Sequence, residues 1–99
     1  MKNFRTYQLA VQFNRRAAAL KLPGYLKDQM RRAASSVALN LAEGAGRFGQ
    51  KDQRKFFTIA MASLRECQAV LDLEDIKDKS LRDLADNLGA HLYKLIQSC

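Results

Sequence analysis

The chain has 99 residues, of which 47% are hydrophobic and 27% are charged, and its formal net charge at pH 7 is +7. This length accommodates one domain, and the hydrophobic fraction is typical of a globular chain and excludes a disordered one. The longest run without a charged residue, 33–42, is about half as long as a membrane-spanning helix. Arg5, Arg15 and Arg16 interrupt the apolar residues where a signal peptide would lie, so we expect a cytoplasmic protein.

Apolar residues recur at helical spacing along the whole chain, and no stretch alternates as a strand does. The first predicted helix covers about Asn3–Lys21, and Pro23 with Gly24 ends it. The second covers about Tyr25–Glu43, with Gly44 as the left-handed residue of its C-cap. The predicted core positions of these two helices are Tyr7, Ala10, Phe13, Ala17, Leu20, Leu26, Met30, Ala33, Val37 and Leu41.

Two further helices follow. The third is predicted over Gln50–Leu71, the charged segment Asp72–Lys79 is predicted to be a loop, and Ser80 opens the fourth helix in a capping box with Asp83. Four helices of similar length joined by short turns predict one all-α domain over residues 1–99, an antiparallel up-and-down four-helix bundle. The predicted core positions of these helices are Phe56, Ala60, Leu64, Cys67, Leu71, Leu81, Leu84, Leu88, Leu92 and Leu95.

The second predicted helix lacks a charged face, because residues 33–42 contain no charge and their apolar side chains point all round the helix. A helix that is apolar all round is buried all round, and four helices of this size do not enclose one of their own members. We therefore expect another subunit to cover it, although an alanine-rich exposed face is the alternative. The candidate interface residues are Ala34, Ser35, Ala38, Leu39 and Ala42.

Asn40 falls near the core-facing stripe of the same helix. A buried amide without partners costs about 1–3 kcal/mol, so neighbouring polar side chains are expected to satisfy it. We predict a buried polar network that sets the register between helices. Its candidate members are Gln29, Ser36, Asn40 and Ser63.

No pattern of catalytic or metal-binding residues stands out. Residues 44–49 match G-x-G-x-x-G, but a dinucleotide site requires a preceding strand and none is predicted. His91 is the only histidine and has no partners at metal-ligand spacing. Cys67 falls on a core stripe and Cys99 is the last residue, so two free thiols are expected. We expect no enzyme activity, no metal and no cofactor.

Positive charge is concentrated in residues 1–65, which carry 13 Lys or Arg against 3 Asp or Glu, whereas residues 66–99 carry 4 against 7. Exposed cations gathered in one region neutralise phosphates without reading base sequence, whereas scattered cations only keep a surface solvated. Phe48 is the only loop aromatic among these cations that is placed to stack on a base. The candidate nucleic-acid-binding residues are Arg15, Arg16, Arg31, Arg32, Arg47, Lys51, Arg54 and Lys55.

Two blocks of the sequence resemble a known family. Residues 31–47, RRAASSVALNLAEGAGR, resemble the signature of the 23S rRNA-intervening-sequence (S23) family of four-helix bundle proteins. Residues 56–66, FFTIAMASLRE, resemble its second block, with Ala62 in place of a glycine. The resemblance implies a bacterial bundle that forms ring-like homo-oligomers, typically pentamers. Accessory proteins of diversity-generating retroelements, similar in fold, work with a reverse transcriptase and nucleic acid.

Two functions remain open at this point. The first is a non-catalytic homo-oligomer that binds RNA or another nucleic acid backbone through a basic face. The second is a protein-interaction scaffold or accessory subunit, for example to a reverse transcriptase, that does not bind nucleic acid directly.

Overall fold

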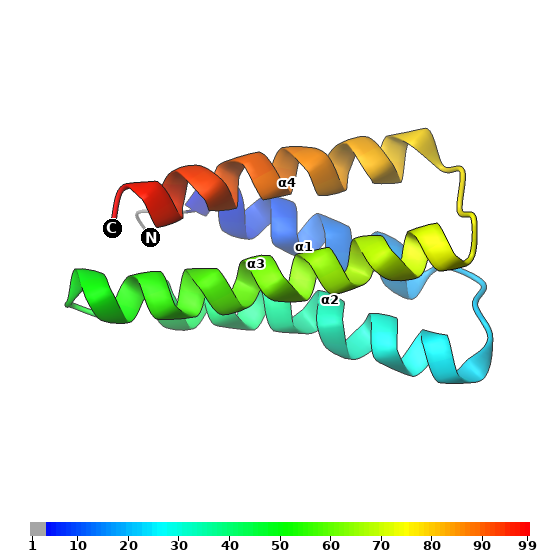
Figure 1. Ribbon diagram of the computed structural model, residues 1–99, viewed down its shortest axis with the longest axis horizontal. Coiled ribbons are helices and arrows are strands. Elements are labelled where there is room, and N and C mark those ends of the chain that lie inside the picture. The colour runs from blue at the N-terminus through cyan, green and yellow to red at the C-terminus, as the bar shows by residue number, and fades with distance from the viewer. Residues whose placement is uncertain (1–3) are drawn as a thin grey trace.

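The computed structural model describes residues 4–99, which form four helices joined by short turns (Figure 1). Helix α1 spans Phe4–Ala18, α2 spans Gly24–Ala45, α3 spans Gln50–Leu73 and α4 spans Lys79–Gln97. Each helix contacts its neighbours in a closed order, α1 with α2, α2 with α3, α3 with α4, and α4 with α1. The predicted up-and-down four-helix bundle is therefore confirmed, and the part of the chain that the structure describes contains no strand.

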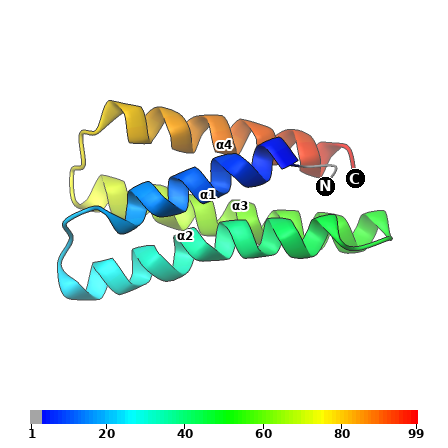
Figure 2. The ribbon, with the colours of Figure 1, turned by 180° about the vertical axis from the view of Figure 1, so that it is seen from behind.

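The molecule is elongated, with principal extents of 40 × 23 × 18 Å. The start of α1, the end of α4 and the α2–α3 turn lie at one end of the bundle (Figures 1 and 2). The α1–α2 and α3–α4 turns lie at the other end. Side chains on the two turns at one end therefore lie far from those on the α2–α3 turn, whatever their distance in sequence.

The core is formed largely by the predicted stripes, but the start of the α3 stripe is shifted in phase. Four predicted core positions outside α3 are only partly buried against the core, namely Tyr7, Leu20, Leu84 and Leu95. All five predicted core positions of α2 are buried. In α3 the prediction began at Phe56, but Phe57 is the buried residue and Phe56 is only half-buried. Phe57 lies seven residues before Leu64, about two helical turns, so both side chains point to the same side. Burial of each such side chain stabilises the fold by about 1.5–3 kcal/mol.

Gly44 has a different role from the one predicted. It is not a left-handed C-cap, because α2 continues through Ala45 and is closed by Gly46 with φ of −84°. Gly44 is buried, and a Cβ added to it would lie 2.7 Å from Cε1 of Phe57 and 3.1 Å from Cβ of Phe56. Its missing side chain lets α3 pack directly against the backbone of α2.

The predicted capping box at the start of α4 is wrong, because the N-cap lies two residues before Ser80. The N-cap is Asp78, whose Oδ1 accepts a hydrogen bond from the Leu81 amide at 3.0 Å. An aspartate caps as well as a serine does and adds a charge that favours the helix N-terminus. Ser80 lies inside the first turn, where its hydroxyl accepts a hydrogen bond from Nη1 of Arg16 at 2.9 Å. The α1 end is thereby joined to the start of α4.

The α3–α4 turn is shorter than predicted, since α3 runs on to Leu73. Arg82 is tied to this turn by hydrogen bonds from Nη2 to the Leu71 carbonyl and from Nε to the Ile76 carbonyl, both at 3.0 Å. The same guanidinium pairs with Asp72. One side chain of α4 thus binds one carbonyl in the last turn of α3 and one in the α3–α4 turn, which holds the turn against the start of α4.

Candidate nucleic-acid interface

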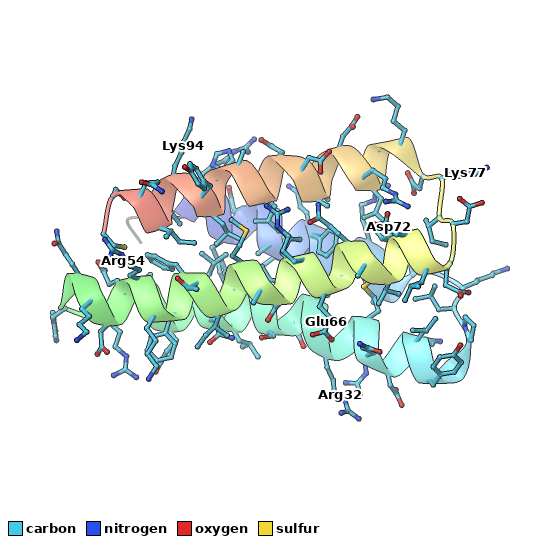
Figure 3. All side chains as sticks on the ribbon, viewed as in Figure 1. Arg32, Arg54, Glu66, Asp72, Lys77 and Lys94 are labelled. Carbon is cyan, nitrogen blue, oxygen red and sulfur yellow. The ribbon has the colours of Figure 1, made fainter. Side chains whose placement is uncertain are left out.

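The eight basic residues predicted from the sequence do not form one continuous face. Arg15 and Arg16 lie at the end of α1, and Arg31 and Arg32 lie in the first half of α2. Figure 3 shows Arg54 at the opposite end of the bundle from the α3–α4 turn and Arg32 in the other half of the molecule. Arg32 and Arg47 are about 22 Å apart along the chain's helical rise. These residues therefore lie in separate groups on the bundle.

Four of these residues gather around the α2–α3 turn and are called here the basic cluster: Arg47, Lys51, Arg54 and Lys55. All four are exposed. Glu43 and Asp52 are the carboxylates that pair with the cluster among the described residues. The cluster therefore keeps a positive balance at this end of the bundle.

Phe56 orients two of the cations. The guanidinium of Arg47 lies 4.8 Å from the centroid of the Phe56 ring, and Nζ of Lys55 lies 5.6 Å from it. Each cation–π contact at an exposed site contributes about 0.5–1 kcal/mol. Arg47 also donates to Oε1 of Glu43 at 2.6 Å and lies 3.8 Å from Asp52. Arg47 is held in place on three sides, which makes it the most constrained member of the cluster.

The other three cations of the cluster differ in whether another group of the protein already binds them. Arg54 donates from Nη2 to the main-chain oxygen of Cys99 at 2.5 Å, which links α3 to the end of α4. Neither Lys51 nor Lys55 has a carboxylate within 4.0 Å in the described part of the chain. These two lysines carry the positive charge that is most available to a ligand.

The turn between α2 and α3 projects one aromatic ring into solvent. Phe48 has a relative exposure of 104%, the exposure of a side chain with no neighbours. A shallow depression of about 440 Å³ lies beside it. That depression is lined by Glu43, Gly46, Arg47, Phe48, Gly49 and Asp52. A second depression, on the adjoining face of α3, is lined by Gly49, Lys51, Asp52, Arg54, Lys55, Thr58 and Ile59.

The other predicted basic residues are less available or lie apart. Arg16 pairs with Asp78 at 3.1 Å and so serves the α1–α4 junction. Arg31 lies 3.9 Å from Asp28. Arg32 is exposed and lines a separate polar depression with Glu66, which Figure 3 shows beside it. That depression also contains the exposed ring of Tyr25 and the carboxylates of Asp28 and Glu66. The basic cluster differs from it in bringing four exposed cations together beside an exposed aromatic ring.

The predicted interface on α2 needs one correction. Ala34 has a relative exposure of 1% and is part of the core, so it does not belong to an exposed face. At 100° per residue it lies only 60° from Val37, which is on the core side of the helix. Ser35 and Ala38 are half-buried, whereas Leu39 is 68% exposed and Ala42 is exposed. The outward face of α2 is therefore centred on Leu39.

The predicted polar network forms without one of its members. Nδ2 of Asn40 donates to the main-chain oxygen of Ser36 at 2.9 Å and to its hydroxyl at 3.0 Å. The hydroxyl oxygens of Ser36 and Ser63 lie 2.8 Å apart, which links α2 to α3. These residues are half-buried and not fully buried. Gln29 is exposed and lies outside the network, with Nε2 3.3 Å from Oε2 of Glu66.

The two cysteines differ in burial, since Cys67 is buried and Cys99 is half-buried. Burial, with a smaller contribution from the charge of Glu66, raises the pKa of the Cys67 thiol to about 12. Cys67 and Cys99 are both free. Within residues 4–99, no three His, Cys, Asp or Glu side chains are placed to hold a metal ion. Across the same residues, no helix has the length and hydropathy needed to cross a membrane.

The fold and the site define a class: a small up-and-down four-helix bundle with a cationic cluster and an exposed aromatic ring at one end. The family model described as 23S rRNA-intervening sequence protein matches residues 2–97, and the chain belongs to this family. The resemblance seen in residues 31–47 and 56–66 is thereby confirmed. A comparison with curated proteins finds no match.

Proposed function

We propose that this protein is a non-catalytic homo-oligomer that binds the backbone of RNA or another nucleic acid through the basic cluster. The observation that carries the proposal is the group of four exposed cations on one turn and the first part of α3. Among residues 4–99, no carboxylate oxygen lies within 4.0 Å of the ammonium group of Lys51 or Lys55. These two lysines can therefore contact a phosphate without breaking an ion pair. Such contacts neutralise phosphates and do not depend on base sequence.

The affinity of the basic cluster for nucleic acid should fall as the salt concentration rises. Each phosphate contact on a single strand adds about −0.7 to the slope of log affinity against log salt concentration. Two to four contacts per subunit therefore lower the affinity about 7- to 50-fold between roughly 50 and 200 mM salt. Because an oligomer presents several clusters to one strand, its overall affinity exceeds that of one subunit.

The oligomeric part of the proposal rests on the outward face of α2. Leu39 is 68% exposed, and no charge occurs in the surrounding residues 33–42. Covering this face with a second copy removes apolar area from water at about 25 cal/mol per Å². Assembly would also place several basic clusters on one particle.

The test is fluorescence anisotropy with a labelled RNA of about 20 nucleotides, long enough for several phosphate contacts. The variant Lys51→Gln/Lys55→Gln removes the two available charges. The matched control Lys21→Gln/Lys27→Gln removes the same charge from exposed positions at the other end of the bundle. We expect the first variant to bind more weakly with a shallower salt slope, and the control to bind as the wild type does.

Two results would overturn the proposal. Absence of any RNA or DNA binding at low salt would remove the nucleic acid, and copurification of a protein that survives nuclease treatment would then favour the scaffold function. Equal loss of binding in both double variants would show that net charge, and not the basic cluster, attracts the nucleic acid.

A further inference from the structure

We infer that the nucleic acid bound at the basic cluster is single-stranded and that the Phe48 ring stacks on one of its unpaired bases. This inference rests on the proposed function and adds to it the class of nucleic acid and the side chain that selects it. It depends on three features of the α2–α3 turn: the exposure of Phe48, its cationic surroundings and the absence of other apolar side chains from residues 46–52.

The exposure of Phe48 differs from that of the other large exposed apolar side chains. Its relative exposure is 104%, whereas Tyr25 at 75% and Leu73 at 73% come next among the described residues. Both faces of its ring are therefore open to solvent. Gly49 follows Phe48 and has no side chain, and the guanidinium of the preceding residue, Arg47, contacts Glu43 and Phe56. A free ring face is what a stacking platform for a base requires.

The ring lies among groups that bind phosphate. Phe48 and Arg47 line the same depression of about 440 Å³, and Lys51 stands on the first turn of the adjoining helix. Contacts from Phe56 and Glu43 hold the Arg47 guanidinium in place. A nucleotide strand that crosses this turn meets cations for its phosphates and an aromatic face for a base, the combination that proteins use to bind single strands.

The same surroundings argue against a duplex and against a protein segment. The bases of a duplex are already stacked on one another, so Phe48 has no free base face to meet there. A protein helix docks through apolar contacts spaced along a groove. Between Gly46 and Asp52, however, Phe48 is the only apolar side chain, and its neighbours are glycine, glutamine and charged residues. One ring among cations matches a base better than it matches a hydrophobic anchor.

The test compares one RNA sequence of about 12 nucleotides as a single strand and as a blunt duplex, with the strand labelled by 2-aminopurine, whose fluorescence falls when it stacks. The variants are Phe48→Leu and the matched control Tyr25→Leu, an exposed aromatic at the other end of the bundle. We expect Phe48→Leu to weaken single-strand binding about 5- to 100-fold. Phe48→Leu should also abolish the 2-aminopurine quenching, while duplex binding and the helical circular dichroism stay as in the wild type. The control Tyr25→Leu should change none of these properties.

The outcomes separate the two proposals. Equal binding of single strand and duplex, unaffected by Phe48→Leu but weakened by Lys51→Gln/Lys55→Gln, would overturn the stacking inference and leave the basic cluster standing. Failure of the wild type to bind either RNA at low salt would overturn both.

Discussion

Gly44→Ala tests whether the close approach of α2 and α3 limits the stability of the bundle. The added Cβ would lie 2.7 and 2.9 Å from two carbons of the Phe57 ring. Carbon atoms in ordinary contact are about 3.5–4.0 Å apart. The Phe57 ring is 2% exposed and lies in a packed core, so it has no open space to move into.

Two effects on the free energy of unfolding oppose each other in this variant. Alanine is favoured over glycine inside a helix by about 1 kcal/mol. Overpacking a core costs about 1–3 kcal/mol. We expect overpacking to win, with a net loss of up to about 2 kcal/mol, because the added atom meets a buried ring and not the end of a flexible side chain.

Gly89→Ala is the matched control, because Gly89 is also a buried glycine within a helix. There the added Cβ would lie 3.5 Å from Cδ2 of Leu64, which is ordinary van der Waals contact. We expect this variant to be neutral or more stable by up to about 1 kcal/mol. The same substitution at two helix positions should therefore change stability in opposite directions.

The assay is thermal unfolding followed by circular dichroism at one fixed protein concentration, because assembly makes Tm depend on concentration. A change of 1 kcal/mol corresponds to about 4–8 °C for a domain of this size. A double-mutant cycle with Phe57→Leu should show coupling with Gly44→Ala, since the smaller side chain relieves the contact. A rise in Tm for Gly44→Ala, or no coupling in the cycle, would refute the packing explanation.

Three further predictions concern charge, reactivity and assembly. The hydrogen bond from the Leu81 amide, together with the charge of Arg16, lowers the pKa of the Asp78 carboxyl below its ordinary value of 3.8. The ionised carboxylate therefore contributes its full stabilisation above that pH, and this contribution is lost as the pH falls through the lowered pKa. The Tm difference between wild type and Asp78→Asn should therefore shrink from pH 7 towards pH 2, and a constant difference would contradict this. Because the pKa of buried Cys67 is raised to about 12, Cys67 should not react with a thiol reagent at pH 8 until urea unfolds the protein. The variant Cys99→Ser leaves Cys67 as the only thiol, and fast reaction of this folded variant would contradict the prediction. Leu39→Glu should reduce the mass measured by light scattering to that of a monomer while Leu73→Glu does not, and a wild-type monomer would exclude the proposed interface.

The sequence by itself determined the helices and most of the core. Helical periodicity is local information, carried by residues three and four apart, so it does not depend on how the helices are arranged. This is why every predicted core position of α2 is buried and why the four-helix bundle was correct. The motif in residues 31–47 likewise indicated the family that the family model confirms.

The helix ends depended on contacts between helices. The sequence indicated Gly44 as the C-cap glycine of α2, but the packing of Phe57 against it shows that Gly44 stays inside α2. The sequence indicated Ser80 as the N-cap of α4, but Asp78 is the residue whose carboxylate accepts from the Leu81 amide, and it also pairs with Arg16 of α1. Both helix ends therefore differ from the local prediction where a neighbouring helix supplies a contact.

The arrangement of the candidate site also belongs to the tertiary structure. The eight basic residues fall into three patches along the sequence, and the antiparallel order of the helices places Arg15 and Arg31 away from the α2–α3 turn. Ala34 moved from the predicted interface into the core because the rotation of α2 about its axis is set by its neighbours. Side-chain charge and size are properties of single residues, whereas their grouping in space depends on how whole helices pack, and only the folded bundle determines that.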